Sequence, residues 1–304
     1  MDVIAKTNQI RQAVIELVTY FAVFDLLVPM DRIVNFLPVK ANHLAVQAAV
    51  RELVLQGVFK RIGDSYGLKS VRYYRADSMS YHRQTLMKRA ERLSRIFRIL
   101  PFVKSVVVIN SVALGNVRDE SDIDLLIVTA PGRIFITRGL LWYFLRFTKL
   151  LQTETDTAGK FSLSLFLTTR GVPMERDIMM TIEPHLMYWI LSAVPVYGAK
   201  SWAETIQASQ YIRERSPNVI WPRGGKSIDR SGWRWLDSWD DRGYRLHLKH
   251  TSQQPRNQTE KAFVRIRPDI INLHPLDQSK KIADTYTALL NKVRKVVSAR
   301  DRRR

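Results

Sequence analysis

The sequence predicts a protein of mixed helices and strands, α/β in the wide sense that includes α+β folds. Three observations lead to this fold class. Two short apolar runs rich in β-branched residues, Val106–Ile109 and Leu125–Val128, have the composition of buried strands. Several longer segments, beginning with Thr7–Phe24, instead repeat their apolar residues at a helical period. The chain of 304 residues is 46% hydrophobic and 25% charged, which is typical of a globular protein with two or three domains.

The first part of the chain predicts three helices and a hairpin. After the helix in Thr7–Phe24, a short helix at Asp31–Leu37 ends before a proline. Asn42 is the expected N-cap of a third helix that runs to Gln56. Val58–Leu68 then holds two short strands around a glycine-containing turn. This order resembles a winged helix-turn-helix domain, to which we assign residues 1–76.

The sequence is compatible with two kinds of partner for this domain. In helix-turn-helix proteins the second helix of the motif enters the major groove of DNA. Here that helix offers Arg51 as its outward-facing charge, and the hairpin adds Lys60 and Arg61. Two interpretations follow: these residues contact nucleic acid, or the domain docks another protein or a second copy of the chain.

A strongly basic amphipathic helix is expected at Ser80–Leu100. Its apolar stripe is accompanied by basic residues on the remaining surface, among them Arg89, Arg92 and Arg95. Such a surface can follow a phosphate backbone. Because the helix leads directly into the first predicted strand, the same residues can also line a nucleotide cleft.

Two carboxylates open the second predicted strand. Side chains alternate along a strand, so Asp122 and Asp124 point to one face while Ile123 and Leu125 point into the core. Two carboxylates on one face repel each other, and a divalent cation removes that repulsion. Ligation by oxygen alone suits Mg²⁺ that bridges to a nucleotide phosphate. The alternative is a solvated Asp-x-Asp sequence without function.

The spacing around these acids resembles that of a known superfamily. Ser111 follows the first strand, and ten residues separate it from Asp122. The DNA polymerase β-like nucleotidyltransferases carry a hydrophobic residue, Gly, Gly or Ser, a spacer of this kind and Asp-hydrophobic-Asp-hydrophobic. Here the similarity covers Ile109–Leu125, with Asn110 at the position of the first Gly. Asn tolerates positive φ better than most residues, so we expect the turn to be preserved.

The resemblance implies a minimal nucleotidyltransferase fold, which we assign with its preceding helix to residues 77–200. It implies that Asp122 and Asp124 are catalytic and hold Mg²⁺ or Mn²⁺, and that an NTP is the substrate. Residues expected near the nucleotide are Asn110, Ser111, Gly115 and Ser121. The order of the predicted elements in Thr7–Pro222 also resembles that of a group of bacterial and archaeal proteins known only as nucleotidyltransferase-domain proteins.

The third strand raises a second functional hypothesis. Phe161–Thr168 alternates apolar and polar residues and is expected to pair with the first two strands. Active relatives usually carry a third carboxylate there, whereas this strand offers Ser162 and Ser164. Asp156 lies upstream in the preceding loop. The activity expected is transfer of a nucleoside monophosphate to an acceptor hydroxyl; the alternative is a catalytically silent fold that binds nucleic acid as a regulator.

The remaining residues, 201–304, predict a basic, mostly helical region. Five tryptophans alternate with arginines and a lysine between Trp202 and Arg242. Such a mixture either stacks on bases and holds phosphates or packs against the preceding domain. Gln278–Ser298 has the apolar period of a terminal helix.

The net charge of +20 is concentrated in two segments. Residues 60–104 carry twelve basic and three acidic side chains, and residues 201–304 carry 22 and 11. This clustering favours DNA or RNA as a partner, with a solvated basic surface as the alternative. The chain lacks cysteine, an early signal peptide pattern and any apolar run near the roughly 20 residues that cross a bilayer. We therefore expect a cytoplasmic protein without membrane contact, whose oligomeric state stays open.

Overall fold

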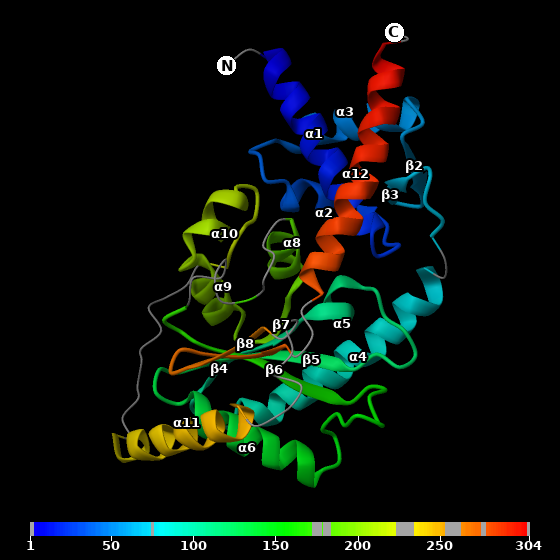
Figure 1. The fold of residues 1–304 in the computed structure, drawn as a ribbon. Coiled ribbons are helices and arrows are strands. Elements are labelled where there is room, and N and C mark those ends of the chain that lie inside the picture. Colours follow the sequence, from blue (N-terminus) through cyan, green and yellow to red (C-terminus); the bar gives the residue numbers. More distant parts are fainter. Residues whose placement is uncertain are drawn as a thin grey trace.

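The chain forms two sheets surrounded by helices in a mixed α/β arrangement, shown in Figure 1. The computed structural model describes residues 3–73, 76–171, 178, 184–222, 234–252, 263–274 and 278–302. A small three-stranded sheet belongs to the N-terminal part of the chain, and a six-stranded sheet forms the centre of the remainder.

The N-terminal unit contains the three predicted helices and the predicted hairpin. Its elements are α1 (Val3–Ala22), β1 (Val28–Pro29), α2 (Met30–Phe36), α3 (His43–Leu55), β2 (Phe59–Ile62) and β3 (Ser65–Leu68). Asn42 caps α3 as expected, because its side-chain oxygen accepts a hydrogen bond of 2.8 Å from the backbone N–H of Ala45. Strand β1 was not predicted; it pairs with β3 and gives the strand order β1-β3-β2.

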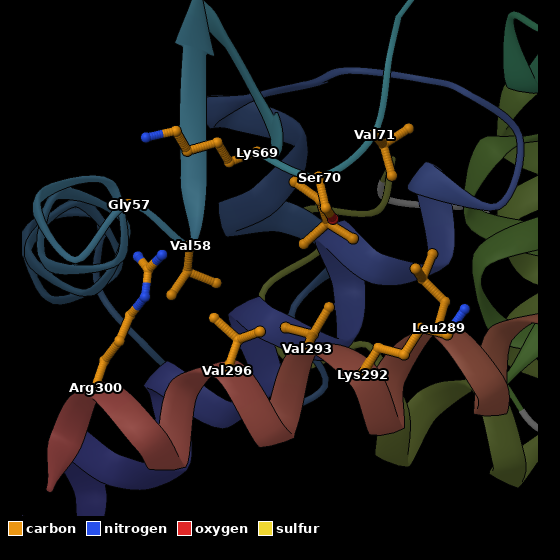
Figure 2. Close-up of a pocket in the computed structure, with 11 residues that line it drawn as sticks. Gly57, Val58, Lys69, Ser70, Val71, Leu289, Lys292, Val293, Val296 and Arg300 are labelled. Carbon is orange, nitrogen blue, oxygen red and sulfur yellow. The ribbon is translucent and has the colours of Figure 1, made fainter.

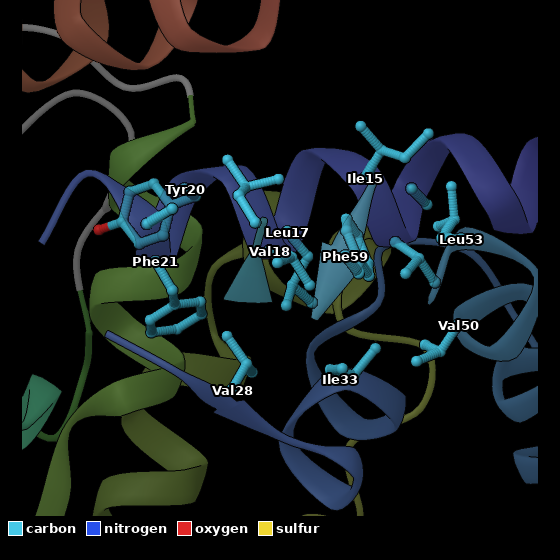
Figure 3. Packing of buried hydrophobic residues seen from close by; sticks show 14 of the residues in the cluster. Ile15, Leu17, Val18, Tyr20, Phe21, Val28, Ile33, Val50, Leu53 and Phe59 are labelled. Carbon is cyan, nitrogen blue, oxygen red and sulfur yellow. The ribbon is translucent and has the colours of Figure 1, made fainter. Parts of the chain in front are cut away.

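The core of this unit forms where α1 lies across α3 and the hairpin. Leu17, Val18 and Phe21 of α1 have no exposed surface and pack with Leu53 of α3 and Phe59 of β2 (Figure 3). The last helix of the chain, α12 (Ser279–Asp301), completes this core. Its buried side chains in the same cluster are Tyr286, Leu290, Val293 and Val297. Helices from the two ends of the described chain therefore share one core (Figure 1).

The central sheet has the strand order β7-β4-β5-β6-β9-β8. Its strands are β4 (Val103–Val108), β5 (Ile123–Thr129), β6 (Phe161–Thr168), β7 (Val194–Tyr197), β8 (Phe263–Arg267) and β9 (Ile270–His274). Strands β5 and β6 are parallel, and every other neighbouring pair is antiparallel. The three strands predicted from the sequence occupy the middle of this sheet.

The sheet differs from the prediction in two places, the neighbours of β6 and the hairpin of β8 and β9, and adds an edge strand. Strand β6 was expected to pair with both earlier strands, but it pairs with β5 and β9, because β4 already lies on the other side of β5. The segment Val194–Tyr197 is an edge strand, β7, that pairs with β4. The hairpin of β8 and β9 was missed entirely, and it brings part of the 201–304 region into the central sheet.

Helices cover both faces of this sheet, as the alternation of buried residues along β5 requires. Leu125 and Ile127 face α4 (Ala76–Phe97) and α6 (Ile134–Phe147), whereas Leu126 and Val128 face the opposite layer. That opposite layer consists of α8 (His185–Ser192), α9 (Ala199–Gln207) and α10 (Gln210–Arg215). The short 3₁₀ turn η1 (Arg234–Leu236) leads into α11 (Asp237–Ser252), which packs on the outer side of α6.

Contacts between α11 and α6 begin at the first turn of α6. The carboxylate of Asp240 accepts hydrogen bonds of 2.9 Å from the backbone N–H groups of both Phe135 and Ile136. The residue preceding α6, Arg133, makes no side-chain capping bond to that turn. Asp240 therefore caps a helix to which it is not adjacent in sequence.

Helix α8 joins the N-terminal unit to the central sheet. Its Tyr188 ring packs against the ring of Tyr20 in α1, with the centroids 4.7 Å apart. The Tyr20 hydroxyl and His185 Nδ1 share a buried hydrogen bond of 2.6 Å. Burial raises the pKa of Tyr20 well above its ordinary value, so the hydroxyl stays protonated at neutral pH.

The tryptophans of the C-terminal region differ in their exposure. Trp202 is buried under the sheet, and Trp221 is half-buried. Trp235 and Trp239 are 64% and 57% exposed, and the guanidinium of Arg242 lies 5.7 Å from the centroid of the Trp239 ring. Trp233 lies outside the described residues.

Candidate active site

The two predicted carboxylates lie at the start of β5, in the middle of the sheet. Ile123 is the first residue of the strand, and it points with Leu125 into the core beneath α4 and α6. Asp122 directly precedes the strand and Asp124 lies within it, and both side chains are half-buried. The charge of Asp124 acts on the carboxyl group of Asp122, so the two acids lie close together.

The acids influence each other electrostatically. Burial, and secondly the negative charge of Asp124, raise the pKa of Asp122 to about 7 from its ordinary value of 3.8. A carboxyl group with such a pKa is only partly ionised at neutral pH. Two half-buried carboxylates without a cation between them are therefore an unfavourable arrangement, and a bound cation would relieve it.

Both oxygens of Asp124 accept hydrogen bonds from the protein. Asn110 Nδ2 donates to one oxygen at 2.8 Å, and the Ser164 hydroxyl donates to the other at 3.2 Å. Ser164 reaches this position because the pairing of β5 with β6 shifts register between Leu125 and Leu126, which leaves Ser164 as the extra residue on β6. The carboxylate is consequently held from two sides.

Asn110 occupies the special backbone position that the sequence analysis expected. Its φ is +56°, in the left-handed region, so the turn is preserved with Asn in place of the first Gly of the motif. Its side chain also accepts a hydrogen bond of 2.7 Å from Trp189 Nε1 in α8. Trp189 and the role of Ser164 were both missed, because no local sequence pattern connects them with the acids.

The predicted nucleotide-binding turn is partly helical. Asn110–Leu114 forms the short helix α5, and Gly115 ends it with φ +102° and a hydrogen bond of 2.9 Å from its N–H to the carbonyl of Ser111. The Ser111 side chain is half-buried and makes no hydrogen bond to the described part of the chain. Ser121 instead closes a local turn, where its hydroxyl accepts from the Arg118 N–H at 2.8 Å.

Two arginines hold the carbonyl end of α5. Arg83 of α4 donates to the carbonyls of Val112 at 2.8 Å and Ala113 at 3.2 Å, and Arg32 of α2 donates to that of Leu114 at 3.4 Å. Burial lowers the pKa of both guanidinium groups from the ordinary arginine value, and for Arg32 the charge of Arg83 adds to this effect. The short helix is thus fixed by both the basic helix and the N-terminal unit.

A third carboxylate does not join the pair within the described residues. Across those ranges, no group of three or more His, Asp or Glu side chains has a metal-binding arrangement. Asp156 forms an ion pair of 3.0 Å with Lys160. The acids Glu175, Asp177 and Glu183 lie outside the part of the chain that the structure describes.

The basic residues proposed for nucleic acid differ in their surroundings. Lys60 donates to the carbonyl of Val71 at 2.7 Å, and Arg61 bonds to Gly63 and Asp64 within the hairpin. Arg89 is half-buried close to Gly159. The exposed members of the set are Arg51, Arg92 and Arg95.

A separate groove lies between the N-terminal unit and α12 (Figure 2). It has a volume of about 440 Å³ and an apolar floor formed in part by Val58, Leu68 and Val293. Lys69, Lys292 and Arg300 stand at its edge. Neither Asp122 nor Asp124 lines it, so it is distinct from the carboxylate pair.

A comparison with protein families finds one match within the chain. Residues 86–178 match the family model of the nucleotidyltransferase domain. This segment supports membership in the nucleotidyltransferase superfamily. The matched nucleotidyltransferase domain starts within α4, includes β4, α5, β5, α6 and β6, and contains both aspartates.

The other two comparisons found no further relationship. No curated protein and no solved structure matches the chain. Within the described ranges, no helix combines the length and the apolar character that crossing a membrane requires. The nucleotidyltransferase domain indicates, in general terms, transfer of a nucleoside monophosphate from a nucleotide substrate.

Proposed function

We propose that the protein is a Mg²⁺- or Mn²⁺-dependent nucleotidyltransferase that transfers a nucleoside monophosphate from an NTP to an acceptor hydroxyl. The observation that carries this proposal is the pair of half-buried aspartates at the start of β5, Asp122 directly before the strand and Asp124 within it, in a segment that matches the nucleotidyltransferase domain. In this reaction the acceptor oxygen forms a bond to the α-phosphorus, the bond to the β-phosphate oxygen breaks, and pyrophosphate leaves.

The donor set fits a hard divalent cation. Asp122 and Asp124 supply oxygen ligands only, and burial together with the charge of Asp124 raises the pKa of Asp122, an effect that a bound cation would oppose. A bound Mg²⁺ would supply neutralisation of the charge that develops on the triphosphate. The chain's own contribution is to hold the two carboxylates on one face, with Asp124 fixed by Asn110 and Ser164.

The triphosphate is assigned to the turn that begins α5. The donors proposed for the phosphates are the backbone N–H groups after Asn110 and the hydroxyl of Ser111, which makes no hydrogen bond within the described residues. They follow directly after the residue that donates to the Asp124 carboxylate. Gly115 contributes by allowing α5 to end within a single turn. Ser121 is expected to shape the loop before Asp122, since its hydroxyl already serves that turn.

The test combines binding with transfer. Calorimetry with ATP and Mg²⁺ should give metal-dependent binding that the double variant Asp122→Ala, Asp124→Ala abolishes, while its circular dichroism stays that of the unaltered chain. Each labelled NTP would then be incubated with total cellular RNA and protein and with either metal. Label transferred by the unaltered chain but not by the double variant supports the proposal, whereas equal nucleotide affinity in the two proteins contradicts it.

A second candidate function is a catalytically silent fold that regulates by binding nucleic acid. The observation that favours it is β6, which presents Ser162 and Ser164 where an active relative is expected to carry an acid. In the transfer assay this candidate predicts nucleotide binding without transferred label, together with binding to DNA or RNA.

The N-terminal unit is proposed to be a winged helix within residues 1–76. Three helices and a three-stranded sheet with its hairpin support this assignment. The outward face of α3 carries Leu44 and Leu55, which are 74% and 73% exposed, beside the single charge of Arg51. This composition favours docking of a protein over reading of DNA bases.

A further inference from the structure

We propose that Trp189 is a positioning residue for the metal-binding carboxylate of Asp124, and that it acts through the side chain of Asn110. This inference rests on the proposed metal-dependent function. It assigns a role to a residue of α8 that lies outside the residues matching the nucleotidyltransferase domain. The chain of contacts runs from Trp189 Nε1 to Asn110 Oδ1 at 2.7 Å and from Asn110 Nδ2 to Asp124 at 2.8 Å.

Chemistry fixes the direction of both hydrogen bonds. An indole N–H is only a donor, so the Asn110 atom that faces Trp189 must be the amide oxygen. An ionised carboxylate is only an acceptor, so the atom that faces Asp124 must be the amide NH₂. The amide therefore has one orientation that satisfies both neighbours, and a flip would lose both bonds.

The backbone contributes to the same arrangement. Asn110 lies two residues after the end of β4 and has a φ of +56°, a conformation that Asn and Gly adopt more readily than other residues. Asn110 is thus the turn-compatible residue that can also bridge the indole and the carboxylate. Glycine, the residue of the superfamily motif at this position, would preserve the turn and remove the bridge.

The bridge matters because Asp122 and Asp124 repel each other when both are ionised. Without restraint, the Asp124 carboxylate can lower the repulsion by rotating away from Asp122. Asn110 and Ser164 each donate to a different oxygen of Asp124 and so restrain that rotation. Each oxygen has two acceptor positions, which leaves one on each for a cation. The carboxylate is therefore oriented before the metal arrives.

The position of Trp189 depends in turn on how α8 packs. The indole is only 4% exposed and lies in the cluster under the sheet. On the same helix, Tyr188 and His185 contact Tyr20 of the N-terminal unit. Trp189 is thus held by packing from two directions, as a residue that orients another side chain requires.

The test compares two buried tryptophans of the same cluster. Trp189→Phe removes the indole N–H that bonds to Asn110. Trp202→Phe is the matched control, since Trp202 is 3% exposed in the same cluster and its indole N–H makes no hydrogen bond within the described residues. Binding of Mn²⁺ would be followed by the electron paramagnetic resonance of the free ion. Trp189→Phe should weaken Mn²⁺ binding by about 10-fold or more. Trp202→Phe should leave the Mn²⁺ affinity within about 2-fold of that of the unaltered chain.

A second variant, Asn110→Gly, tests the bridge without changing the buried Trp189, in case Trp189→Phe fails to fold. Asn110→Gly retains the positive φ and should weaken Mn²⁺ binding to a similar extent. In the Asn110→Gly background, Trp189→Phe should have no further effect on Mn²⁺ affinity, because the bridge is already absent. Independent additive losses would contradict action through Asn110.

A spectroscopic measurement on the unaltered chain completes the experiment. In ¹⁵N-tryptophan-labelled protein, addition of Mg²⁺ should shift the indole signal of Trp189 and leave that of Trp202 in place. If Mn²⁺ binds and Asp124→Ala removes the binding, yet Trp189→Phe and Trp202→Phe behave alike, the positioning role is wrong and the proposed function stands. If the unaltered chain binds no Mn²⁺, both proposals are wrong.

Discussion

Asp122 is a residue whose charge works against folding. The pKa of its carboxyl group is about 7 in the folded protein, above the ordinary value of 3.8. The folded state therefore holds this proton more tightly than the unfolded state does. The resulting contribution to stability is present in acid and is lost as the pH rises from about 4 through about 7. Such a cost is understandable at a site whose charge is needed for a ligand.

We expect Asp122→Asn to stabilise the metal-free protein at pH 8, by roughly 1–2 kcal/mol once partial exposure of the group is allowed for. Below about pH 4 the unaltered side chain is already neutral, so the difference should vanish there. Urea unfolding at the two pH values measures this. Asp119→Asn, at an exposed carboxylate of the same loop, is the control. A difference that does not change with pH would contradict the electrostatic cause.

At the scale of elements, α5 is too short to be stable by itself. One turn of helix gains few internal hydrogen bonds, and its terminal carbonyls need partners from elsewhere. Arg83 and Arg32 provide them from α4 and α2. Their positive charges also lie at the helix end where the macrodipole is negative. The proposed nucleotide-binding turn thus derives its shape from two distant elements.

We expect Arg83→Ala to lower the free energy of unfolding by about 1–3 kcal/mol, because it leaves carbonyls of α5 without a partner. Nucleotide affinity should fall with it, since the proposed phosphate-binding turn loses its support. Arg83→Lys keeps the charge but loses the two-pronged geometry, so its effect should be intermediate. Denaturant unfolding and calorimetry with ATP measure the two effects, and Arg92→Ala on the exposed side of the same helix is the control. Unchanged stability in Arg83→Ala would contradict this account.

At the scale of the whole molecule, the basic side chains fall into two groups. Those of the first group contact other parts of the protein, for example Arg83 at α5 and Arg11, which pairs with Asp301 at 2.8 Å. Others, such as Arg92 and Arg95 on α4, are exposed. A partner that uses the second group would be recognised through phosphates more than through bases.

Binding to duplex DNA should accordingly depend strongly on salt and little on sequence. The log–log slope is expected to be about −0.9 for each phosphate that is neutralised. Replacing Arg92 and Arg95 by Gln should weaken binding to random and genomic fragments alike, while Arg51→Ala should change little. Competition binding at several salt concentrations measures both. A preference for one fragment that Arg51→Ala removes would instead assign sequence reading to α3.

Local patterns were sufficient for the elements that surround the acids. The β-branched runs predicted β4 and β5, and the Asn42 cap predicted the start of α3. The hairpin of β8 and β9 escaped prediction because its hydrogen-bonding partner, β6, is about a hundred residues earlier in the chain. Trp189 escaped for the same reason, since its contact with Asn110 depends on how α8 packs under the sheet.

The shared core of α1 and α12 has a consequence for synthesis of the chain. Ribosomes add roughly 5–20 residues per second, and α12 begins more than 250 residues after α1 ends. The apolar face of α1 that α12 covers is therefore exposed for roughly 10–50 s on each nascent chain. We expect the N-terminal unit to be open to chaperone binding during that interval, until α12 has emerged and covers this face of α1.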